Sequence, residues 1–410
     1  MLPASASVNM VARCNRIVPL FALACACAVA TVYFAHPLLV TMGQDLGIAP
    51  AVLGAVVTTT QIGYGLGLFL LVPLGDLVNR RRLVTAQFAL LAAALLTVGT
   101  ASTLTVLLTG MAAVGLLAVV TQSLVAFAAS LAEPARRGRV LGTVTSGVVS
   151  GILVARTVSG VVSDLAGWRA VYLAAAGVCA LLAVTLHLAL PDTAPNPLRY
   201  GQLLRSTVRM FAREPVLRAR SALAVLVFAA FSVLWSSVTL PLSAMSLSHT
   251  AIGAFGLAGL AGALAASPAG RLHDRGLGQW TTGTALGLLV LSWVPLALTQ
   301  RSLWALAVGA VLLDLAVQAV HVTNQSMIYA VRQDAGSRVI GGYMVFYSIG
   351  SGTGAIAATA AYSVGGWPGV CALGAAISLL ALVVWAVHAR VHANRVSSTD
   401  TVSPAPAPPV

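Results

Sequence analysis

The chain has 410 residues, of which 59% are hydrophobic and 8% are charged, and its formal net charge is +13. A soluble domain usually has about a quarter of its residues charged, so this composition excludes a large soluble enzyme. All 23 basic residues are arginines, and their concentration in alternate loops excludes nucleic acid as the partner that the charge serves.

Residues 1–16 form a short polar and basic tail. The apolar run that begins at Ile17 is too long for a signal peptide and leads into further apolar runs, so it predicts a first membrane span. Stretches of about 20 apolar residues, the length of a helix that crosses a bilayer, recur after it. The spans predicted for the first half, residues 17–190, are 17–41, 51–73, 83–101, 105–131, 140–163 and 169–190.

Residues 191–220 interrupt this pattern with prolines and six arginines, and they predict a cytoplasmic linker with an amphipathic helix around 202–212. The spans predicted for the second half, residues 221–388, are 221–243, 250–269, 280–299, 303–331, 339–363 and 368–388. The proline-rich tail, 389–410, is predicted to be disordered. The fold class is therefore an all-α membrane protein with 12 transmembrane helices in two six-helix bundles, and both termini lie in the cytoplasm.

Two charged loops of similar sequence lie between neighbouring spans, one in each half. The first runs Val72-Pro-Leu-Gly-Asp-Leu-Val-Asn-Arg-Arg-Arg-Leu83, and the second runs Pro268-Ala-Gly-Arg-Leu-His-Asp-Arg-Gly276. Gln122 and Gln318 end a second pair of similar segments, 196 residues apart. Repeated halves of the same topology are one of the architectures of membrane transporters.

The first loop resembles the signature of the major facilitator superfamily, because Leu74, Gly75, Asp76, Arg80 and Arg81 fit the pattern Gly-x-Leu-small-Asp-Arg-x-Gly-Arg-basic. The second loop keeps four positions of it: Gly270, Leu272, Asp274 and Arg275. The resemblance covers residues 17–388. It implies a secondary transporter that works by rocker-switch alternating access, without a cofactor or a metal, as a monomer in the bacterial inner membrane.

Further segments resemble the multidrug and sugar-efflux branch of the superfamily, whose members are proton antiporters. These segments are Thr60-Gln-Ile-Gly-Tyr-Gly65, Arg156-Thr-Val-Ser-Gly160, Gly167-Trp-Arg169 and His321-Val-Thr-Asn-Gln-Ser326. The resemblance implies proton-coupled efflux of a drug-like or sugar-like solute. This chain departs from the branch at Ala155-Arg156, where Gly-Pro is usual, so an uptake symporter, a uniporter or a non-transporting sensor stay as alternatives.

Two charges fall inside predicted spans, Arg156 in the fifth and Asp314 in the tenth. A charge in the bilayer is costly and normally faces a cavity or a partner. We hypothesise that Asp314 exchanges the coupled proton or binds a cationic substrate, and that Arg156 is its charge partner or an anion site. The alternative is a permanent ion pair that holds two helices together.

A polar stripe surrounds Asp314 on the tenth span. Asp314, Gln318, His321 and Gln325 are spaced i, i+4, i+7 and i+11, so they share one helical face, and Asn324 lies beside it. Polar groups at this depth face protein or water rather than lipid. The stripe therefore predicts a wall of a substrate cavity, or else a set of hydrogen bonds that joins helices.

The superfamily resemblance implies that spans 1, 4, 7 and 10 surround the cavity. On that basis the remaining candidates for the cavity are Gln122, Tyr33, His36, Phe231, Trp235, Gln61 and Tyr64. The aromatic residues among them suit a lipophilic substrate, and ordinary packing is the alternative for each.

The charged loops predict a cytoplasmic gate. Asp76 would contact Arg80 or the start of the eleventh span near residues 339–342, and Glu133 is a second candidate partner for the arginines at positions 80–82. By resemblance, such contacts close the cytoplasmic side when the transporter faces outward. The gate prediction covers Asp76, Arg80, Arg81, Glu133, Gly270, Asp274 and Arg275.

Overall fold

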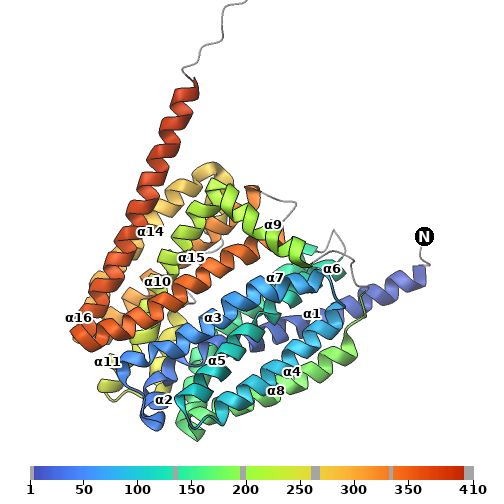
Figure 1. Ribbon diagram of the computed structural model, residues 1–410, viewed down its shortest axis with the longest axis horizontal. Coiled ribbons are helices and arrows are strands. Elements are labelled where there is room, and N and C mark those ends of the chain that lie inside the picture. Colours follow the sequence, from blue (N-terminus) through green and yellow to red (C-terminus); the bar gives the residue numbers. More distant parts are fainter. Residues whose placement is uncertain (1–3, 133–136, 194–199, 260–267, 332–335, 401–410) are drawn as a thin grey trace, which may run out of the picture.

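A computed structural model describes residues 4–132, 137–193, 200–259, 268–331 and 336–400, and within these ranges it contains helices and turns but no strand (Figure 1). The expected all-helical membrane fold is confirmed. The polypeptide forms two bundles, one from each half of the sequence.

The first bundle is built from long apolar helices that begin at recognisable caps. Asn79 accepts a hydrogen bond from the backbone N–H of Arg82 and starts α4, and Thr103 does the same for Val106 at the start of α5. The elements of this bundle are α1 (Ala4–Tyr33), η1 (His36–Leu38), α2 (Leu39–Leu46), η2 (Pro50–Val52), α3 (Gly54–Leu70), η3 (Val72–Asp76), α4 (Arg80–Gly99), α5 (Leu104–Ala118), α6 (Val120–Leu131), α7 (Arg137–Ala166) and α8 (Trp168–Ala189).

The second bundle follows the linker region. Pro215, the first residue of α10, lacks the N–H that a helix start leaves unsatisfied, so it suits that position. The elements are α9 (Tyr200–Arg213), α10 (Pro215–Ser237), α11 (Thr239–Ala244), α12 (His249–Ala254), η4 (Phe255–Ala258), η5 (His273–Leu277), α14 (Gly278–Ala297), α15 (Leu303–Val331) and α16 (Gly336–Asp400).

Ten stretches of the described residues are long and apolar enough to cross a membrane. The last, Val339–Arg390, has 52 residues and turns at Gly366, whose φ of 58° and ψ of −155° suit only glycine. Its two arms contain the predicted spans 339–363 and 368–388. The predicted span 250–269 begins in α12 and η4, and residues 260–267 lie outside the described ranges. The count of twelve therefore stays a prediction.

Large apolar side chains cover the outside of both bundles. Leu165 is 82% exposed and Val364 is 92% exposed, far from the sparse apolar exposure of a soluble protein. Such side chains fit a hydrocarbon environment, where the helices satisfy their own backbone hydrogen bonds.

The linker region contains an amphipathic helix, α9, at the position that the sequence predicted. Its Tyr200 hydroxyl donates to the carbonyl of Leu70 in the first bundle (2.7 Å), and its Phe211 stacks on Phe346 in the second. The helix therefore contacts both bundles. The predicted linker ended at residue 220, but α10 already begins at Pro215.

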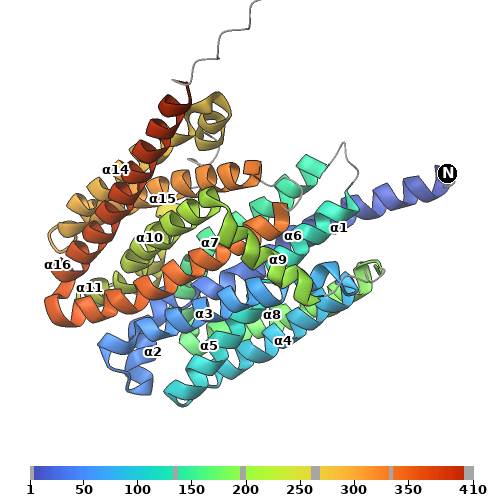
Figure 2. The ribbon, with the colours of Figure 1, turned by 45° about the horizontal axis from the view of Figure 1, so that its top comes forward.

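The two bundles meet mainly at one end. There α3 packs on the first arm of α16, α7 packs on α12, and α2 lies beside α11 (Figure 2). We call this the closed end, and we call the end that holds α9 and Arg80–Arg82 the linker end. Toward the linker end the bundles diverge in both views (Figures 1 and 2).

Candidate functional site

A cavity of about 330 Å³ lies between the two bundles. Its walls come from α1, α3, α6 and α7 of the first bundle and from α10, α15 and α16 of the second. Gly259, the residue after η4, also lines it. Most of the residues predicted for the cavity and its charge pair line it: Tyr33, Tyr64, Gln122, Arg156, Phe231, Asp314, Gln318, His321 and Gln325.

The predicted stripe of α15 forms one wall. Asp314, Gln318, His321 and Gln325 all border the cavity, and they extend over about 16 Å at 1.5 Å per residue. Because α15 runs toward the linker end, Asp314 lies at the deep, closed end of the cavity and Gln325 lies nearest the opening.

Arg156 occupies the deep end on the side of α7 and is only 3% exposed. Its guanidinium carbon lies 4.0 Å from the ring centroid of Trp235, 5.4 Å from that of Tyr33 and 5.7 Å from that of Phe231. Three aromatic rings from two bundles therefore surround one cation.

Trp235 connects this cation to Asp314. Its indole Nε1–H donates to Oδ1 of Asp314 at 3.0 Å, while its ring lies against Arg156. Asp314, 5% exposed, is the only buried carboxylate among the described residues. Arg156 and Asp314 thus share the deep end, but no ion pair joins them. Instead of the predicted direct pair, Trp235 contacts Arg156 with its ring and Asp314 with its N–H.

The surroundings of Arg156 satisfy it only in part. A cation–π contact contributes about 2 kcal/mol or more when it is desolvated, whereas burying an ion costs several kcal/mol even after the protein relaxes. Asp314 attracts Arg156 through space, but the guanidinium Nε and Nη2 are buried with no hydrogen-bond partner. The deep end therefore holds a cation with two unused donors.

Hydrogen-bonded aromatic residues form the next layer of the cavity. The hydroxyls of Tyr33 and Tyr347 lie 2.8 Å apart and join α1 to α16 across the two bundles. His321 Nδ1 lies 3.2 Å from the Tyr343 hydroxyl, and its ring meets the edge of Phe228 at 5.1 Å. Tyr343 and Tyr347 were not singled out from the sequence, although they lie four residues apart on one helical face.

Four predicted cavity residues do not line it. Trp235 lies behind Arg156, and Gln61 is buried near Gly352 where α3 packs on α16. Asn324 is fully buried because ten residues of helix turn it about 80° away from Asp314, off the stripe. His36 lies at the closed end, because the helix α1 ends at Tyr33 and a 3₁₀ turn begins at His36.

Arg220 is a buried charge that the sequence analysis placed among the linker arginines. It is 3% exposed, and its Nη1 donates to Oγ1 of Thr282 (3.3 Å) and Oδ1 of Asn324 (3.2 Å). Its spacing from the buried Leu217, Ala224 and Phe228 indicates the inner face of α10, and that periodicity is the signal that identifies it.

At the closed end, a carboxylate of the first bundle accepts hydrogen bonds from the start of a helix of the second bundle. Asp164, at the end of α7, accepts hydrogen bonds from the backbone N–H and Oγ1 of Thr250 (2.8 and 2.6 Å) and from the backbone N–H of His249 (3.1 Å). His249 Nδ1 lies 2.6 Å from Asp164, and its Nε2 lies 2.5 Å from Oγ1 of Thr41. The imidazole therefore bridges two residues of the first bundle.

The backbones of the two bundles come close at the same end. A side chain at Gly160 would meet the carbonyl of His249, and one at Gly253 would meet the carbonyl of Arg156. The Thr239 hydroxyl also donates to the carbonyl of His36 at 2.7 Å. Glycine at these crossings thus permits the seal that places α12 against α7 and Arg156.

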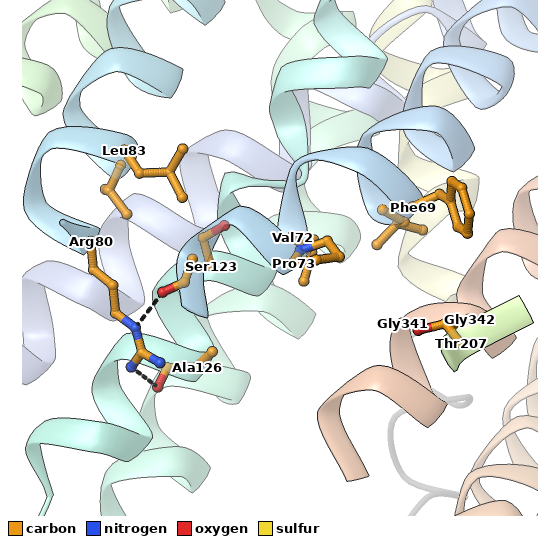
Figure 3. Close-up of a pocket in the computed structure, with 13 residues that line it drawn as sticks. Phe69, Val72, Pro73, Arg80, Leu83, Ser123, Ala126, Thr207, Gly341 and Gly342 are labelled. Atoms are coloured by element: carbon orange, nitrogen blue, oxygen red, sulfur yellow. Dashed lines mark hydrogen bonds between the residues drawn. The ribbon is translucent and has the colours of Figure 1, made fainter. Parts of the chain in front are cut away.

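At the linker end, the hydrogen bonds described for Arg80 and Arg81 lie within the first bundle and the linker. Arg80 donates from Nε to the carbonyl of Gly75 (2.8 Å) and from Nη1 to that of Ala126 (3.4 Å), as Figure 3 shows. Opposite them, Gly341, Gly342 and Thr207 line the far side of a small pocket (Figure 3). The two bonds of Arg80 thus hold it against the first bundle.

Arg81 pairs with Asp192 at the start of the linker. Its Nη1 lies 3.0 Å from Oδ2 of Asp192. A hydrogen bond from Asn79, and then the charge of Arg81, hold the pKa of Asp192 below its ordinary value of 3.8. The other predicted gate acids, Asp76, Glu133 and Asp274, have side chains outside the described residues. Gly270 and Arg275 are described at the second loop, where Arg275 is exposed.

Comparison with known sequences places this geometry in a family. A sequence profile of the Major Facilitator Superfamily matches residues 21–290 and 221–409. The "Uncharacterized transporter YgaY" of Escherichia coli O157:H7 is 43% identical over 372 residues, which are 90% of this chain and 94% of the relative. "Probable transporter SCO4007" of Streptomyces coelicolor is 33% identical over 377 residues, which are 90% and 87% of the two chains.

Solved structures share the fold. A bacterial homolog of the human lysosomal transporter Spinster, in an inward-facing and unoccupied conformation, superposes with a TM-score of 0.74 at 15% identity, over 96% of this chain and 99% of the other. The POT family transporter PepTSo superposes with a TM-score of 0.68 at 13% identity, over 92% and 98% of the two chains. At these identities the likeness concerns the fold alone.

Proposed function

This chain belongs to the major facilitator superfamily, and from that premise we propose that it moves a small organic solute across the membrane by alternating access, driven by protons. Membership makes it a multi-pass membrane transporter rather than an enzyme. We place it in the bacterial cytoplasmic membrane, as a monomer with both termini in the cytoplasm, because its arginines concentrate on the side of the linker.

Asp314 is the observation on which proton coupling rests. It is the only buried carboxylate in the described residues, it borders the cavity, and it has no ion-pair partner among them. A carboxyl group in a membrane span is costly to keep for structure alone. A proton that moves on and off Asp314 as the cavity opens to each side would connect the proton gradient to the movement of the solute.

The arrangement of the bundles supports alternating access. Asp164, His249 and Thr250 join the bundles at the closed end, and the bundles diverge toward the linker end (Figures 1 and 2). With the linker in the cytoplasm, this conformation exchanges solute with the cytoplasm. It is the state in which export begins and import ends.

Export is the direction that the sequence resemblance favours, since the related branch exchanges solutes for protons. Import together with protons is a second candidate. It is favoured by the presence of Arg156 and Asp314 in one cavity, because a solute at Arg156 and a proton on Asp314 could occupy the cavity together.

Transport in liposomes tests the proposal. The solute is selected from a panel of sugars, organic cations and organic acids by its stabilisation of the purified protein. A pH gradient should drive its accumulation, and Asp314→Asn should reduce that accumulation at least tenfold while exchange without a gradient persists, because only the proton step is lost. Asp192→Asn, at the exposed linker end, is the control. Unchanged gradient-driven accumulation in Asp314→Asn would exclude this residue as the coupling group.

A further inference from the structure

We propose that the solute is an organic anion with an apolar body, and that its negatively charged group binds the guanidinium of Arg156. This inference rests on the proposed transport function and names the chemical class of its substrate. Three observations support it: the unpartnered donor nitrogens of Arg156, the aromatic rings and Asp314 around them, and the apolar side chains that line the rest of the cavity.

Arg156 presents two donor nitrogens that no protein group uses. The side chain is 3% exposed and lines the cavity, and its Nε and Nη2 are buried without a partner. A guanidinium presents its N–H groups in one plane, in a fork that matches the oxygens of a carboxylate, sulfonate or phosphate. Buried donors of this kind normally have a partner, so an anionic ligand in the cavity supplies what the protein lacks.

The aromatic rings hold the guanidinium without using these donors. Trp235 lies closest, with its centroid 4.0 Å from the guanidinium carbon, and Tyr33 and Phe231 lie farther out. Cation–π attraction leaves the N–H groups free, because it acts on the charge rather than through the hydrogen-bond fork. The site is thus fixed in place before a ligand arrives.

Asp314 does not serve as the counter-ion of Arg156. Its Oδ1 accepts from Trp235, and no ion pair joins the two residues, both of which are described. When Asp314 is protonated, Arg156 is the only charged side chain in the wall of the cavity as described. A carboxylate ligand then finds one positive charge and no competing negative charge.

The rest of the wall fits an apolar body. Val29, Val148, Ile152, Leu153, Val317 and Met344 line the cavity between the deep end and the opening. Its volume of about 330 Å³ is at the small end for an organic ligand. A phenyl ring on a short chain, with an acid at its end, matches both the size and the distribution of charge.

Anion binding would also be linked to the proton. A bound anion repels an ionised Asp314, so the anion and the protonated form of Asp314 favour each other, and the linkage is reciprocal. The other charged or titratable groups that line the cavity are Arg156 from α7, Tyr33 from α1, Tyr64 from α3, Tyr347 from α16 and His321 from α15 itself. Positive linkage favours joint movement of anion and proton.

A series of ligands that differ only in charge tests the inference on the wild-type protein. The probes are 4-phenylbutyrate, 4-phenylbutanamide and 4-phenylbutylamine, and phenylacetate and 6-phenylhexanoate vary the length of the acid. Binding is measured by calorimetry in detergent. We expect at least one acid to bind roughly tenfold to a hundredfold more tightly than its amide and amine, the usual effect of a charged hydrogen bond. Equal or tighter binding of the amine, or binding by no member of the series, would overturn the proposal.

Three variants then locate the acid. Arg156→Gln should abolish the preference for the acid over the amide, Arg156→Lys should keep part of it, and Asp314→Asn should bind the acid at least as tightly as the wild type. Arg301→Gln, an exposed arginine, is the control for net charge. An unchanged preference in a folded Arg156→Gln protein would refute the site.

Flux of radiolabelled 4-phenylbutyrate into liposomes separates this inference from the proposed function. Binding of the acid at Arg156 without flux would support the substrate class and count against transport. Flux of the amide or amine that Arg156→Gln leaves unchanged would support transport and refute the anion class.

Discussion

The two ends of the interface between the bundles use polar groups differently. At the closed end, Asp164 of one bundle accepts hydrogen bonds from His249 and Thr250 of the other. At the linker end, the described bonds of Arg80 and Arg81 stay within the first bundle and the start of the linker. The described polar bonds of the closed end thus join the two bundles, while those described for Arg80 and Arg81 do not.

This difference indicates how one chain reaches two conformations. A transporter of this kind needs two states of similar free energy, since a ligand shifts their populations only by its differential affinity for them. Opening the closed end breaks the bonds of Asp164. Closing the linker end brings the arginine-rich loop toward Gly341 and Gly342, which face it across the small pocket (Figure 3). In the proposed alternating-access cycle, new packing at the linker end would offset the hydrogen bonds that break at the closed end.

The largest effect should come from filling the glycine crossing at the closed end. Gly253→Leu places a side chain against the backbone carbonyl of Arg156, so α12 cannot approach α7. Overpacking of this kind costs roughly 1–3 kcal/mol, which shifts the populations roughly fivefold to a hundredfold toward the conformation in which this end is open. Spin labels at Thr100 and Ser302, one on each bundle, should move apart, and flux should fall.

The matched control for that change is Gly177→Leu. Gly177 lies on the exposed side of α8 with open space around it, so the same substitution should leave both the label distance and the flux unchanged. Equal label distances in Gly253→Leu and the wild type would show that the crossing does not seal the cavity.

A smaller shift in the same direction is expected from Asp164→Ala. The variant removes the acceptor of four hydrogen bonds, and bonds to a charged group contribute about 1.5–3 kcal/mol each before water replaces them. We expect the ratio of the two conformations to shift by roughly tenfold toward the one in which the closed end has opened. In a double-mutant cycle with His249→Ala, the two effects should not add, because both residues act in one contact. Additive effects would show that Asp164 and His249 stabilise the closed end independently, which would contradict the shared contact.

The sequence predicted the fold and the stripe because both follow from regular spacing. Repeated loops and apolar lengths identify the superfamily, and residues spaced four and seven apart share a face of α15 whatever surrounds it. The same spacing places Asn324 off the stripe, because ten residues of helix turn it about 80° away from Asp314, and the structure buries it there. His36 was expected in the cavity from the resemblance rather than from spacing, and it lies outside the cavity because α1 ends at Tyr33 and a 3₁₀ turn begins at His36.

The arrangement at the deep end could not be derived from spacing. Arg156, Trp235 and Asp314 come from three helices and two bundles, so their relation depends on how the bundles pack. The sequence identified all three residues and paired the two charges directly, since opposite charges in a membrane usually pair. The indole of Trp235 contacts both instead: its ring face lies against Arg156, and its N–H donates to Asp314.

A modest effect is expected where the linker helix crosses between the bundles. Tyr200→Phe removes the hydroxyl that donates to the carbonyl of Leu70, which is a contact between α9 and the first bundle. A neutral hydrogen bond contributes about 1 kcal/mol. Hydrogen exchange of α9 should rise severalfold, while the label distance at the closed end should stay constant. The substitution Tyr362→Phe, on α16, is the control. Slower exchange of α9 in Tyr200→Phe would contradict the contact.

The smallest effect is expected from Asp192→Asn, since Asp192 is exposed and bonds only within the first bundle and linker. Its pKa is lowered in the folded protein, so its contribution to stability is present above the ordinary value of 3.8 and is lost as the pH falls through the folded pKa. Thermal unfolding should therefore show a small, constant difference from wild type between pH 7 and pH 5 that disappears in more acidic buffer. Asn79→Ala should reduce this difference more than Arg81→Gln does, because the Asn79 hydrogen bond is the larger cause. Since none of these bonds joins the bundles, the label distance at the closed end should not change in Asp192→Asn. A change there would mean that the linker end takes part in sealing the opposite end, and the contrast between the two ends would fail.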